Sequence, residues 1–248
     1  MPKKRLDQLL QELLPTYSRQ QIQSWIMQGK IKVNGAVITK PGNATPDDAK
    51  IEYDIQEPKY VSRAGFKLEK ALDEFNIDVT GLTVLDAGLS TGGFADCLLQ
   101  RGAAKIYGID VGYGQAHEKI RADSRVIVME RTNLRDLHDL GQQVDLVTLD
   151  LSFISVLKVM DAIDHLLKSD GKLIVLVKPQ FEAQKHEVGK GGIVRDDAIR
   201  EQVVKQVVNG IALHGYQLQG LVESPITGTD GNREFLAYFL KNNATVKQ

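Results

Sequence analysis

A glycine-rich turn between a short apolar strand and a helix constrains this chain more than any other feature. The segment from Val84 to Phe94 reads Val-Leu-Asp-Ala-Gly-Leu-Ser-Thr-Gly-Gly-Phe. Apolar residues before the turn indicate a buried strand, and those after it, as far as Leu98, follow helical spacing. Glycines let a backbone pass close to a ligand, and the first turn of a helix offers free N–H groups. The segment therefore predicts a sheet with helices packed on it and a ligand at the turn.

The turn excludes two common nucleotide-binding motifs and resembles a third. A P-loop needs Lys and then Ser or Thr after its last glycine, but Phe94 and Ala95 stand there. A dinucleotide fingerprint needs G-x-G-x-x-G, but Ser90 takes the place of the middle glycine. The turn is similar to the first motif of S-adenosylmethionine-dependent methyltransferases, which implies S-adenosyl-L-methionine as the cofactor. The residues that this resemblance assigns to cofactor binding are Asp86, Gly88, Ser90, Thr91, Gly92, Gly93 and Phe94.

Two polar residues after the next strands extend this expected site. Asp110 follows the strand expected over 105–109, where an acidic side chain can accept both ribose hydroxyls of an adenosine. Asn133 lies in the Glu-Arg-Thr-Asn segment after the strand expected over 126–129, where such folds usually contact the adenine. We therefore expect Asp110 and Asn133 to contact the cofactor.

The remainder of the chain after residue 63 alternates strands and helices. Strands are expected over 144–149, 171–177, 216–223 and 234–240, and helices over 156–167 and 196–214. This alternation predicts an α/β domain, Rossmann-like, with a mostly parallel seven-stranded sheet. We assign residues 63–248 to it, residues 59–62 to a linker, and residues 1–58 to a smaller α+β domain.

The first domain is basic although the whole chain is not. Residues 1–40 contain seven Lys or Arg and two Asp or Glu, against a formal net charge of −1 for the chain. Helical spacing predicts helices over 6–14 and 18–28, with Ser18 as N-cap, and Asn34-Gly35 predicts a tight hairpin over 31–37. A basic cluster is either a solvated helix face or a surface that contacts phosphates.

The order Arg5-Leu-Asp…Ser18-Arg19…Trp25-Ile26…Val33-Asn34-Gly35 resembles the S4 domain, a module that binds structured RNA. The resemblance covers nearly all of the first 55 residues and favours the phosphate-contacting interpretation. Together with a residue near the linker, the expected RNA contacts are Lys4, Arg5, Arg19, Lys30, Lys32 and Arg63.

Four polar residues fall where strand ends line the cleft of a doubly wound sheet. Asp150 follows the strand over 144–149, Lys178 follows the strand over 171–177, Glu234 begins the last strand, and Lys67 lies in the helix that enters the domain. Transfer of a methyl group to a ribose 2′-hydroxyl requires removal of the hydroxyl proton. We expect Lys178 to be that base, Lys67 to be the nearby second cation, and Asp150 and Glu234 to hold both ammonium groups. Phe153 and Phe181 either stack on a flipped nucleotide or pack in the core.

The Lys-Asp-Lys-Glu order resembles the FtsJ/RrmJ class of ribose 2′-O-methyltransferases. The whole chain is similar to the TlyA (hemolysin A) family, which joins an S4 domain to an FtsJ-like domain and methylates cytidines of rRNA at the 2′-hydroxyl. The resembling segments are 60–68, 86–94, 150–155, 177–182, 189–196 and 224–236. This resemblance implies ribosomal RNA or ribosomal subunits as partners. The pattern departs from the family at Leu89, Ala64 and Gln184, none of them among the four catalytic candidates.

Composition argues against a secreted or membrane-spanning protein. Cys97 is the single cysteine, no apolar stretch follows Lys3–Arg5, and no apolar run approaches the roughly 18–20 residues that span a bilayer. We therefore expect a soluble, cytoplasmic protein and disfavour a membrane-active hemolysin. The five histidines show no metal-ligand spacing, so no metal is expected: they are His117, His138, His165, His186 and His214.

Other functions remain as alternatives. The chain could be an RNA-binding assembly factor whose methyltransferase domain is inactive, although the intact set of four residues disfavours this. It could also methylate a base, a protein or a small molecule. Base-amino methylation usually places Asn/Asp-Pro-Pro-Tyr/Phe after the fourth strand, whereas Asp-Leu-Ser-Phe stands at 150–153. The sequence does not specify an oligomer and is compatible with a monomer.

Overall fold

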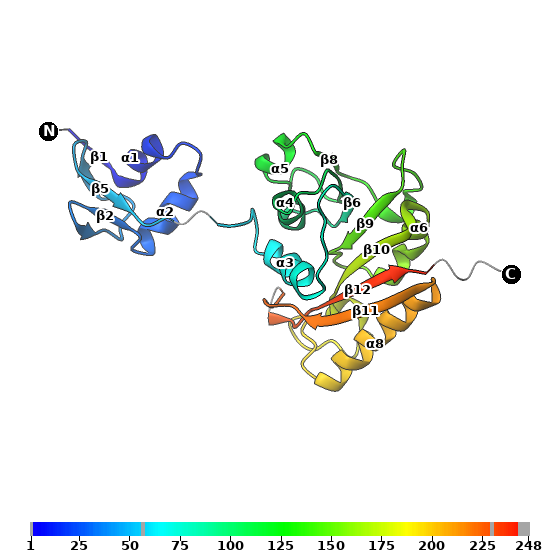
Figure 1. Ribbon diagram of the computed structural model, residues 1–248. Coiled ribbons are helices and arrows are strands. Elements are labelled where there is room, and N and C mark those ends of the chain that lie inside the picture. Colours follow the sequence, from blue (N-terminus) through cyan, green and yellow to red (C-terminus); the bar gives the residue numbers. More distant parts are fainter. Residues whose placement is uncertain (1, 56–57, 229–230, 243–248) are drawn as a thin grey trace. The chain divides into compact units, whose positions relative to one another are not determined.

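The computed structural model describes residues 2–55, 58–228 and 231–242. The chain divides into two compact units, Met1–Pro58 and Lys59–Gln248 (Figure 1). Each unit has its own apolar core, so each is described by itself.

The first unit combines two helices with short strands. Its elements are β1 (Lys3–Arg5), α1 (Leu6–Leu13), α2 (Arg19–Met27), β2 (Ile31–Val33), β3 (Ala36–Val37), β4 (Ala44–Pro46) and β5 (Ile51–Tyr53). The helices bury one apolar face each, with Leu6 and Leu10 of α1 against Ile22 and Ile26 of α2. Strands β3, β2 and β5 form one sheet, and β1 pairs with β4 in another.

Local sequence signals correctly predicted much of this unit. Ser18 caps α2 in a reciprocal capping box with Gln21, as its position before the apolar residues predicted. Asn34 and Gly35 have φ of 49° and 81° and join β2 to β3, the geometry that Asn-Gly favours. The basic residues Lys3–Arg5 form strand β1, which pairs with β4 and which the sequence did not predict.

The second unit is a seven-stranded, mostly parallel sheet, which confirms the predicted fold class. Its strands are β6 (Thr83–Ala87), β7 (Lys105–Ile109), β8 (Val126–Met129), β9 (Val144–Leu149), β10 (Leu167–Val177), β11 (Tyr216–Glu223) and β12 (Phe235–Lys241). The strand order is β11-β12-β10-β9-β6-β7-β8, and only β12 runs antiparallel to both of its neighbours. The carboxyl ends of the parallel strands therefore meet at one edge of the sheet.

Helices cover both faces of this sheet. They are α3 (Ala64–Glu74), α4 (Gly93–Gln100), α5 (Glu118–Ala122), α6 (Met160–Leu166), α7 (Pro179–Glu182) and α8 (Asp197–Leu213), with 3-10 turns η1 (Leu134–Asp136) and η2 (Val156–Val159). Apolar residues of α3, α4 and α5 pack in one core, and those of α6 and α8 pack in a second. Successive residues of a strand enter different cores, as Val84 and Leu85 do, because strand side chains alternate between faces.

Residues 59–62 are packed into the second unit and are not the linker that we expected. Tyr60 is buried against Gly65, where an added Cβ would overlap the tyrosine ring. The N–H of Val61 donates to the buried Asp96 carboxylate at 2.8 Å, and the Gln100 amide donates to the Lys59 carbonyl at 2.7 Å. The second unit therefore begins before α3, with residues 59–62, here called the strap, hydrogen-bonded to α4.

Candidate active site

The glycine-rich turn lies between β6 and α4, as predicted. Gly88 and Gly92 have φ of 88° and 91°, and Ser90 between them has φ of 47°. A Cβ on Gly88 would overlap the carbonyl oxygen of Asp150 at the end of β9. Glycine at this position therefore allows the turn to touch the neighbouring strand end.

Asp86 lies beneath this turn rather than in the cleft beside it. Its side chain is 0% exposed, and Oδ1 accepts the Thr148 hydroxyl at 2.9 Å. Burial, opposed by the Thr148 hydrogen bond, raises the pKa of Asp86 to about 7. A fully buried carboxylate does not line the cleft, which corrects the direct cofactor contact that we expected of Asp86.

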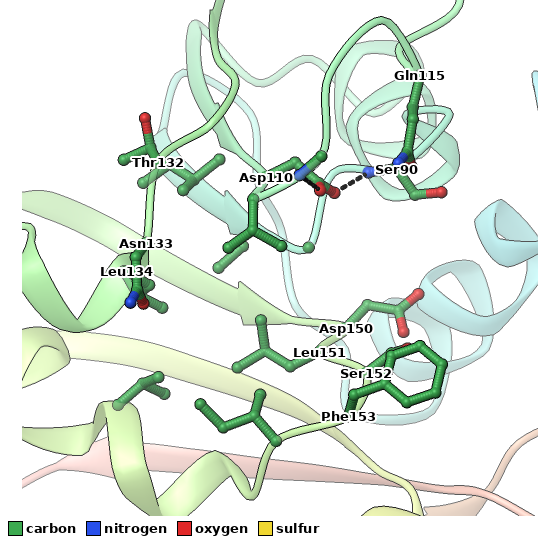
Figure 2. Close-up of a pocket in the computed structure, with 17 residues that line it drawn as sticks. Ser90, Asp110, Gln115, Thr132, Asn133, Leu134, Asp150, Leu151, Ser152 and Phe153 are labelled. Atoms are coloured by element: carbon green, nitrogen blue, oxygen red, sulfur yellow. Dashed lines mark hydrogen bonds between the residues drawn. The ribbon is translucent and has the colours of Figure 1, made fainter.

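Asp110 lies at the wall of the cleft, where the sequence placed it. Its two carboxylate oxygens accept the backbone N–H groups of Ser90 and Gly112, each at 2.7 Å (Figure 2). These bonds tie the glycine-rich turn to the end of β7. Each carboxylate oxygen has a second lone pair, so Asp110 can still accept hydroxyl groups of a ligand.

The cleft beside Asp110 has a volume of about 390 Å³. The expected residues Gly88, Ser90, Asp110 and Asn133 line it. Sequence reasoning missed some of its lining: Gln115, Leu134, Leu151, Ser152 and Val159. Loops after the strand ends supply most of these, and a motif search at the turn alone gives no sign of them.

A smaller hollow of about 80 Å³ lies on the other side of the turn. Thr91, Gly93 and Phe94 line it, together with Ser62 and Ala64 from the strap and the start of α3. Asp150 and Gly88 line both hollows. Gly92, also expected in the cofactor site, instead packs against Ile120 of α5.

Asp150 and Lys178 form an ion pair at the ends of the neighbouring strands β9 and β10. Lys178 Nζ lies 2.6 Å from Asp150 Oδ1 and donates to Ser152 Oγ at 2.9 Å. The contact with Asp150 Oδ1 is an ion pair without hydrogen-bond geometry, whereas the contact with Ser152 Oγ is a hydrogen bond. Both charged side chains are at most 15% exposed.

Lys67 and Glu234 form a second and more deeply buried ion pair. Lys67 Nζ of α3 donates to Glu234 Oε2 at 2.5 Å, with 8% and 2% of the two side chains exposed. The four residues predicted to act together are therefore arranged as two ion pairs. Since burial of an unpaired charge is costly, each pair depends on both of its members.

Phe153 projects into solvent beside the Asp150–Lys178 pair. Its side chain is 91% exposed, and its φ of 64° is unusual for a non-glycine residue. Its ring lies against that of Phe181, with centroids 4.9 Å apart. Of the two interpretations that the sequence left open, core packing is wrong for Phe153.

Two of the expected RNA contacts in the first unit bind a buried carboxylate. Arg5 and Arg19 each donate to Asp7, which also accepts from Gln23. These hydrogen bonds, with that of Arg5 first, hold the pKa of Asp7 well below its usual range. Both arginine side chains remain about half exposed, so they also face solvent, and Arg19 joins α2 to Asp7 of α1.

The other predicted RNA contacts are on the surface of their units. Lys30 and Lys32 are exposed and line a shallow hollow with Tyr53. Lys4 is paired with Glu12 at 2.9 Å. Arg63 is exposed at the start of α3 in the second unit.

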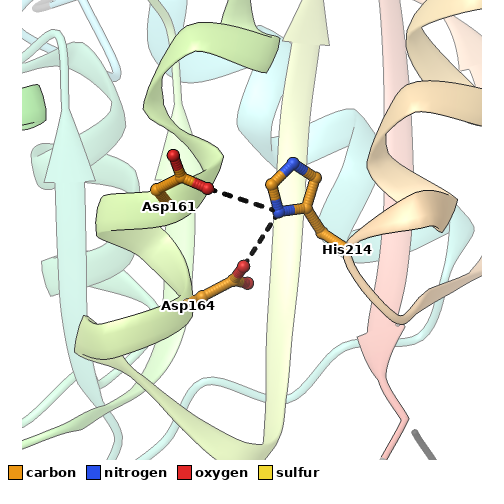
Figure 3. Close-up of side chains that lie close together, drawn as sticks. All are labelled: Asp161, Asp164 and His214. Carbon is orange, nitrogen blue, oxygen red and sulfur yellow. Dashed lines mark hydrogen bonds and ion pairs between the residues drawn. The ribbon is translucent and has the colours of Figure 1, made fainter. Parts of the chain in front are cut away.

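A histidine and two aspartates meet at the opposite end of β10 from Lys178. His214 Nδ1 lies 2.9 Å from Asp164 Oδ2 and 3.9 Å from Asp161 Oδ1 (Figure 3). Tyr216 donates to the other oxygen of Asp164 at 2.8 Å. Spacing along the chain gave no sign of this grouping, because α6 and α8 are distant in sequence. The contacts join the end of α8 to α6.

The fold and the cleft define a Rossmann-like methyltransferase domain that follows a small α+β domain. The chain belongs to the FtsJ-like methyltransferase family, whose model matches residues 60–241, and residues 4–43 match the S4 domain. Both matches confirm the resemblance noted in the sequence. Within residues 2–55, 58–228 and 231–242, no helix is long and apolar enough to cross a membrane.

Similar proteins carry two kinds of name. The chain is 41% identical to Hemolysin A of Brachyspira hyodysenteriae over 239 residues, which cover 95% of this chain and 99% of the relative. It is 42% identical over 224 residues to the 16S/23S rRNA (cytidine-2'-O)-methyltransferase TlyA of Mycobacterium tuberculosis. These residues cover 89% of this chain and 84% of the relative. A solved structure from Streptococcus thermophilus, provisionally described as a hemolysin, matches with a TM-score of 0.75 and 38% identity. The match covers 98% of this chain and 90% of that structure's chain.

Proposed function

We propose that this chain transfers a methyl group from S-adenosyl-L-methionine to the 2′-hydroxyl of a cytidine ribose in ribosomal RNA. The observation that carries the proposal is the Asp150–Lys178 pair, because Asp150 and Ser152, which Lys178 Nζ contacts, both line the cleft. The TlyA relative, whose name states this reaction, supports the choice of substrate. A ribosomal substrate implies that the protein works in the cytoplasm.

The residues at the cleft suit this cofactor. Asp110 offers acceptors for ribose hydroxyls, and Asn133 with Leu134 offers a polar and an apolar contact for an adenine. Gly88 and Ser90 bring the backbone of the turn to the wall of the same cleft. When bound, S-adenosyl-L-methionine supplies a methyl group on a positively charged sulfur.

Lys178 in its neutral form takes the proton of the attacking hydroxyl. Asp150 and Ser152 hold Lys178 Nζ in one direction, so the base is oriented before the substrate arrives. The Lys67–Glu234 pair supplies the second ammonium group that the mechanism requires. Phe153 is exposed beside Lys178, the general base, and its ring stacks on the nucleobase of the flipped target nucleotide.

The first unit supplies affinity for RNA. Lys30 and Lys32 offer charge to phosphates, and Lys4, Arg5 and Arg19 add to it. Arg63 of the second unit supplies one further positive charge. Such contacts fix where the enzyme binds, whereas the choice of ribose is made at the cleft.

The test is methyl transfer from labelled S-adenosyl-L-methionine to unmodified ribosomes, separated subunits and bare rRNA. We expect the label at a ribose 2′-oxygen with the wild type. In Lys178→Ala the rate falls at least roughly 100-fold, the usual contribution of a general base, while cofactor binding persists. Lys168→Ala, at the far end of β10, is the matched control and retains full activity.

Two outcomes would contradict the proposal. Full activity of Lys178→Ala excludes this lysine as the base. Cofactor binding without transfer to any RNA leaves an RNA-binding assembly factor or a different methyl acceptor.

A further inference from the structure

Glu182, at the end of the short helix α7, has no part in the steps above. Helix α7 directly follows Lys178, so Lys178 and Glu182 are separated by a single helical turn. Both side chains reach the same loop, residues 151–155, which connects β9 to η2. Lys178 contacts the start of this loop and Glu182 contacts its end.

Glu182 acts here as a hydrogen-bond acceptor. Oε1 accepts the backbone N–H of Val156 at 2.8 Å. Val156 is buried at the first position of η2, so the bond satisfies an N–H that the 3-10 turn leaves open. Burial raises the pKa of Glu182 above its usual value.

The loop that Glu182 holds carries groups that face the reaction. Leu151 and Ser152 line the cleft, and Phe153 projects from the loop with a positive φ. The segment from Lys178 to Glu182 makes two contacts with the loop, Lys178 with Ser152 and Phe181 with Phe153. Glu182 makes a third contact with Val156, the residue directly after the loop. A loop with a strained residue needs such restraints to keep one conformation.

We infer that Glu182 is a positioning residue for the base. By fixing the end of the 151–155 loop to the turn that carries Lys178, it keeps Ser152 and Phe153 in place beside Lys178 Nζ. The inference rests on the proposed function, because that function makes Lys178 the base. Displacement of a reacting group by about 1 Å can cost on the order of 100-fold in rate, so a residue outside the chemistry can have a large effect.

Two variants of Glu182 separate the effect of its acceptor oxygen from that of its charge, and a third variant, at Glu187, is the control. Glu182→Gln keeps an acceptor at the same reach and loses the charge, whereas Glu182→Ala loses both. Glu187→Ala is the matched control, because Glu187 accepts the N–H of Gln184 at 2.8 Å within the next loop. If Glu182→Ala does not fold, Glu182→Asp, one methylene shorter, replaces it.

In single-turnover methyl transfer, we expect Glu182→Ala to be roughly 10- to 100-fold slower than the wild type. Glu182→Gln and Glu187→Ala remain close to the wild-type rate, and the cofactor dissociation constant changes little in all three. The inference is overturned if Glu182→Ala keeps the wild-type rate, if Gln does not rescue it, or if cofactor affinity falls in proportion to the rate.

Hydrogen exchange at the Val156 amide gives a readout that needs no substrate. Exchange should be faster in Glu182→Ala than in the wild type and unchanged in Glu182→Gln and Glu187→Ala. Equal exchange in Glu182→Ala and the wild type overturns the inference whatever the activity. If the wild type methylates no RNA, the proposed function fails, and the exchange experiment still decides whether Glu182 holds the loop.

Discussion

At the scale of single residues, two buried aspartates are stabilised in opposite ways. Asp7 is surrounded by donors from Arg5, Arg19 and Gln23, which favour its charged form. Asp86 has one hydroxyl donor and a fully buried second oxygen without a hydrogen bond, which favours its neutral form. The sequence assigned Arg5 and Arg19 to RNA and Asp86 to the cofactor, because spacing alone cannot reveal which charges meet in the interior.

The neutral form of Asp86 predicts a pH-dependent stability. Its pKa rises from an ordinary 3.8 to about 7 on folding, so the folded state binds the proton more tightly than the unfolded state. The stabilisation is complete below the ordinary value and is lost as pH rises through about 7. Relative to Asp86→Asn, which does not titrate, the wild type should lose up to about 1.4 kcal/mol of unfolding free energy per pH unit in this window.

Urea unfolding of both proteins, at steps of one pH unit, measures this difference. Thr148→Val removes the Asp86 hydrogen bond and keeps the carboxyl group, so it serves as the control that still titrates. Parallel stability curves for the wild type and Asp86→Asn would show that Asp86 is charged in the folded state.

At the scale of elements, periodicity and turn chemistry correctly predicted helices, hairpins and turns. They did not predict which distant segments of the chain pair with each other. The capped α2, the Asn34-Gly35 hairpin and the strand–turn–helix at Gly88 depend on neighbours in sequence, so the sequence predicted them. The β1–β4 pair and the strap at Tyr60 depend on contacts with distant residues. The same limit explains why Lys67, Asp150, Lys178 and Glu234 could be named but not sorted into pairs.

The contact between the glycine-rich turn and β9 predicts a severe effect of Gly88→Ala. The added Cβ would overlap the Asp150 carbonyl, so either the turn or the strand end must move. We expect loss of cofactor binding and a lower melting temperature. Gly81→Ala is the control, because Gly81 has a similar φ of 75° with nothing near its Cβ, and should cost only about 1 kcal/mol.

Isothermal titration with S-adenosyl-L-methionine and thermal unfolding measure both effects. Equal behaviour of Gly88→Ala and Gly81→Ala would mean that the turn tolerates a side chain at Gly88. The close approach to Asp150 would then not be essential.

At the scale of the whole molecule, the proposed function assigns RNA binding mainly to the first compact unit and methyl transfer to the second. The first unit contains the basic residues near the amino terminus, and the second contains the cleft and both ion pairs. Variants that change the charge of one unit need not disturb the other. Affinity for RNA and catalysis can thus be altered independently.

Lys30 and Lys32 give the cleanest test of the first unit, because they are exposed, whereas Arg5 and Arg19 also hold Asp7. The double variant Lys30→Ala with Lys32→Ala should weaken RNA binding and reduce the slope of log affinity against log salt by roughly 0.7–0.9 per lost phosphate contact. Lys168→Ala with Lys205→Ala removes the same charge from the second unit and is the control. Affinities measured over a salt series would contradict the proposal if both double variants behave alike.

The ion pair between Lys67 and Glu234 joins residues 167 positions apart. A ribosome that makes this chain therefore completes the strands around the cleft long before it reaches Glu234. On the proposed function, any chain made only as far as a residue before Glu234 lacks the partner of Lys67, so we expect it to lack the second ion pair of the site.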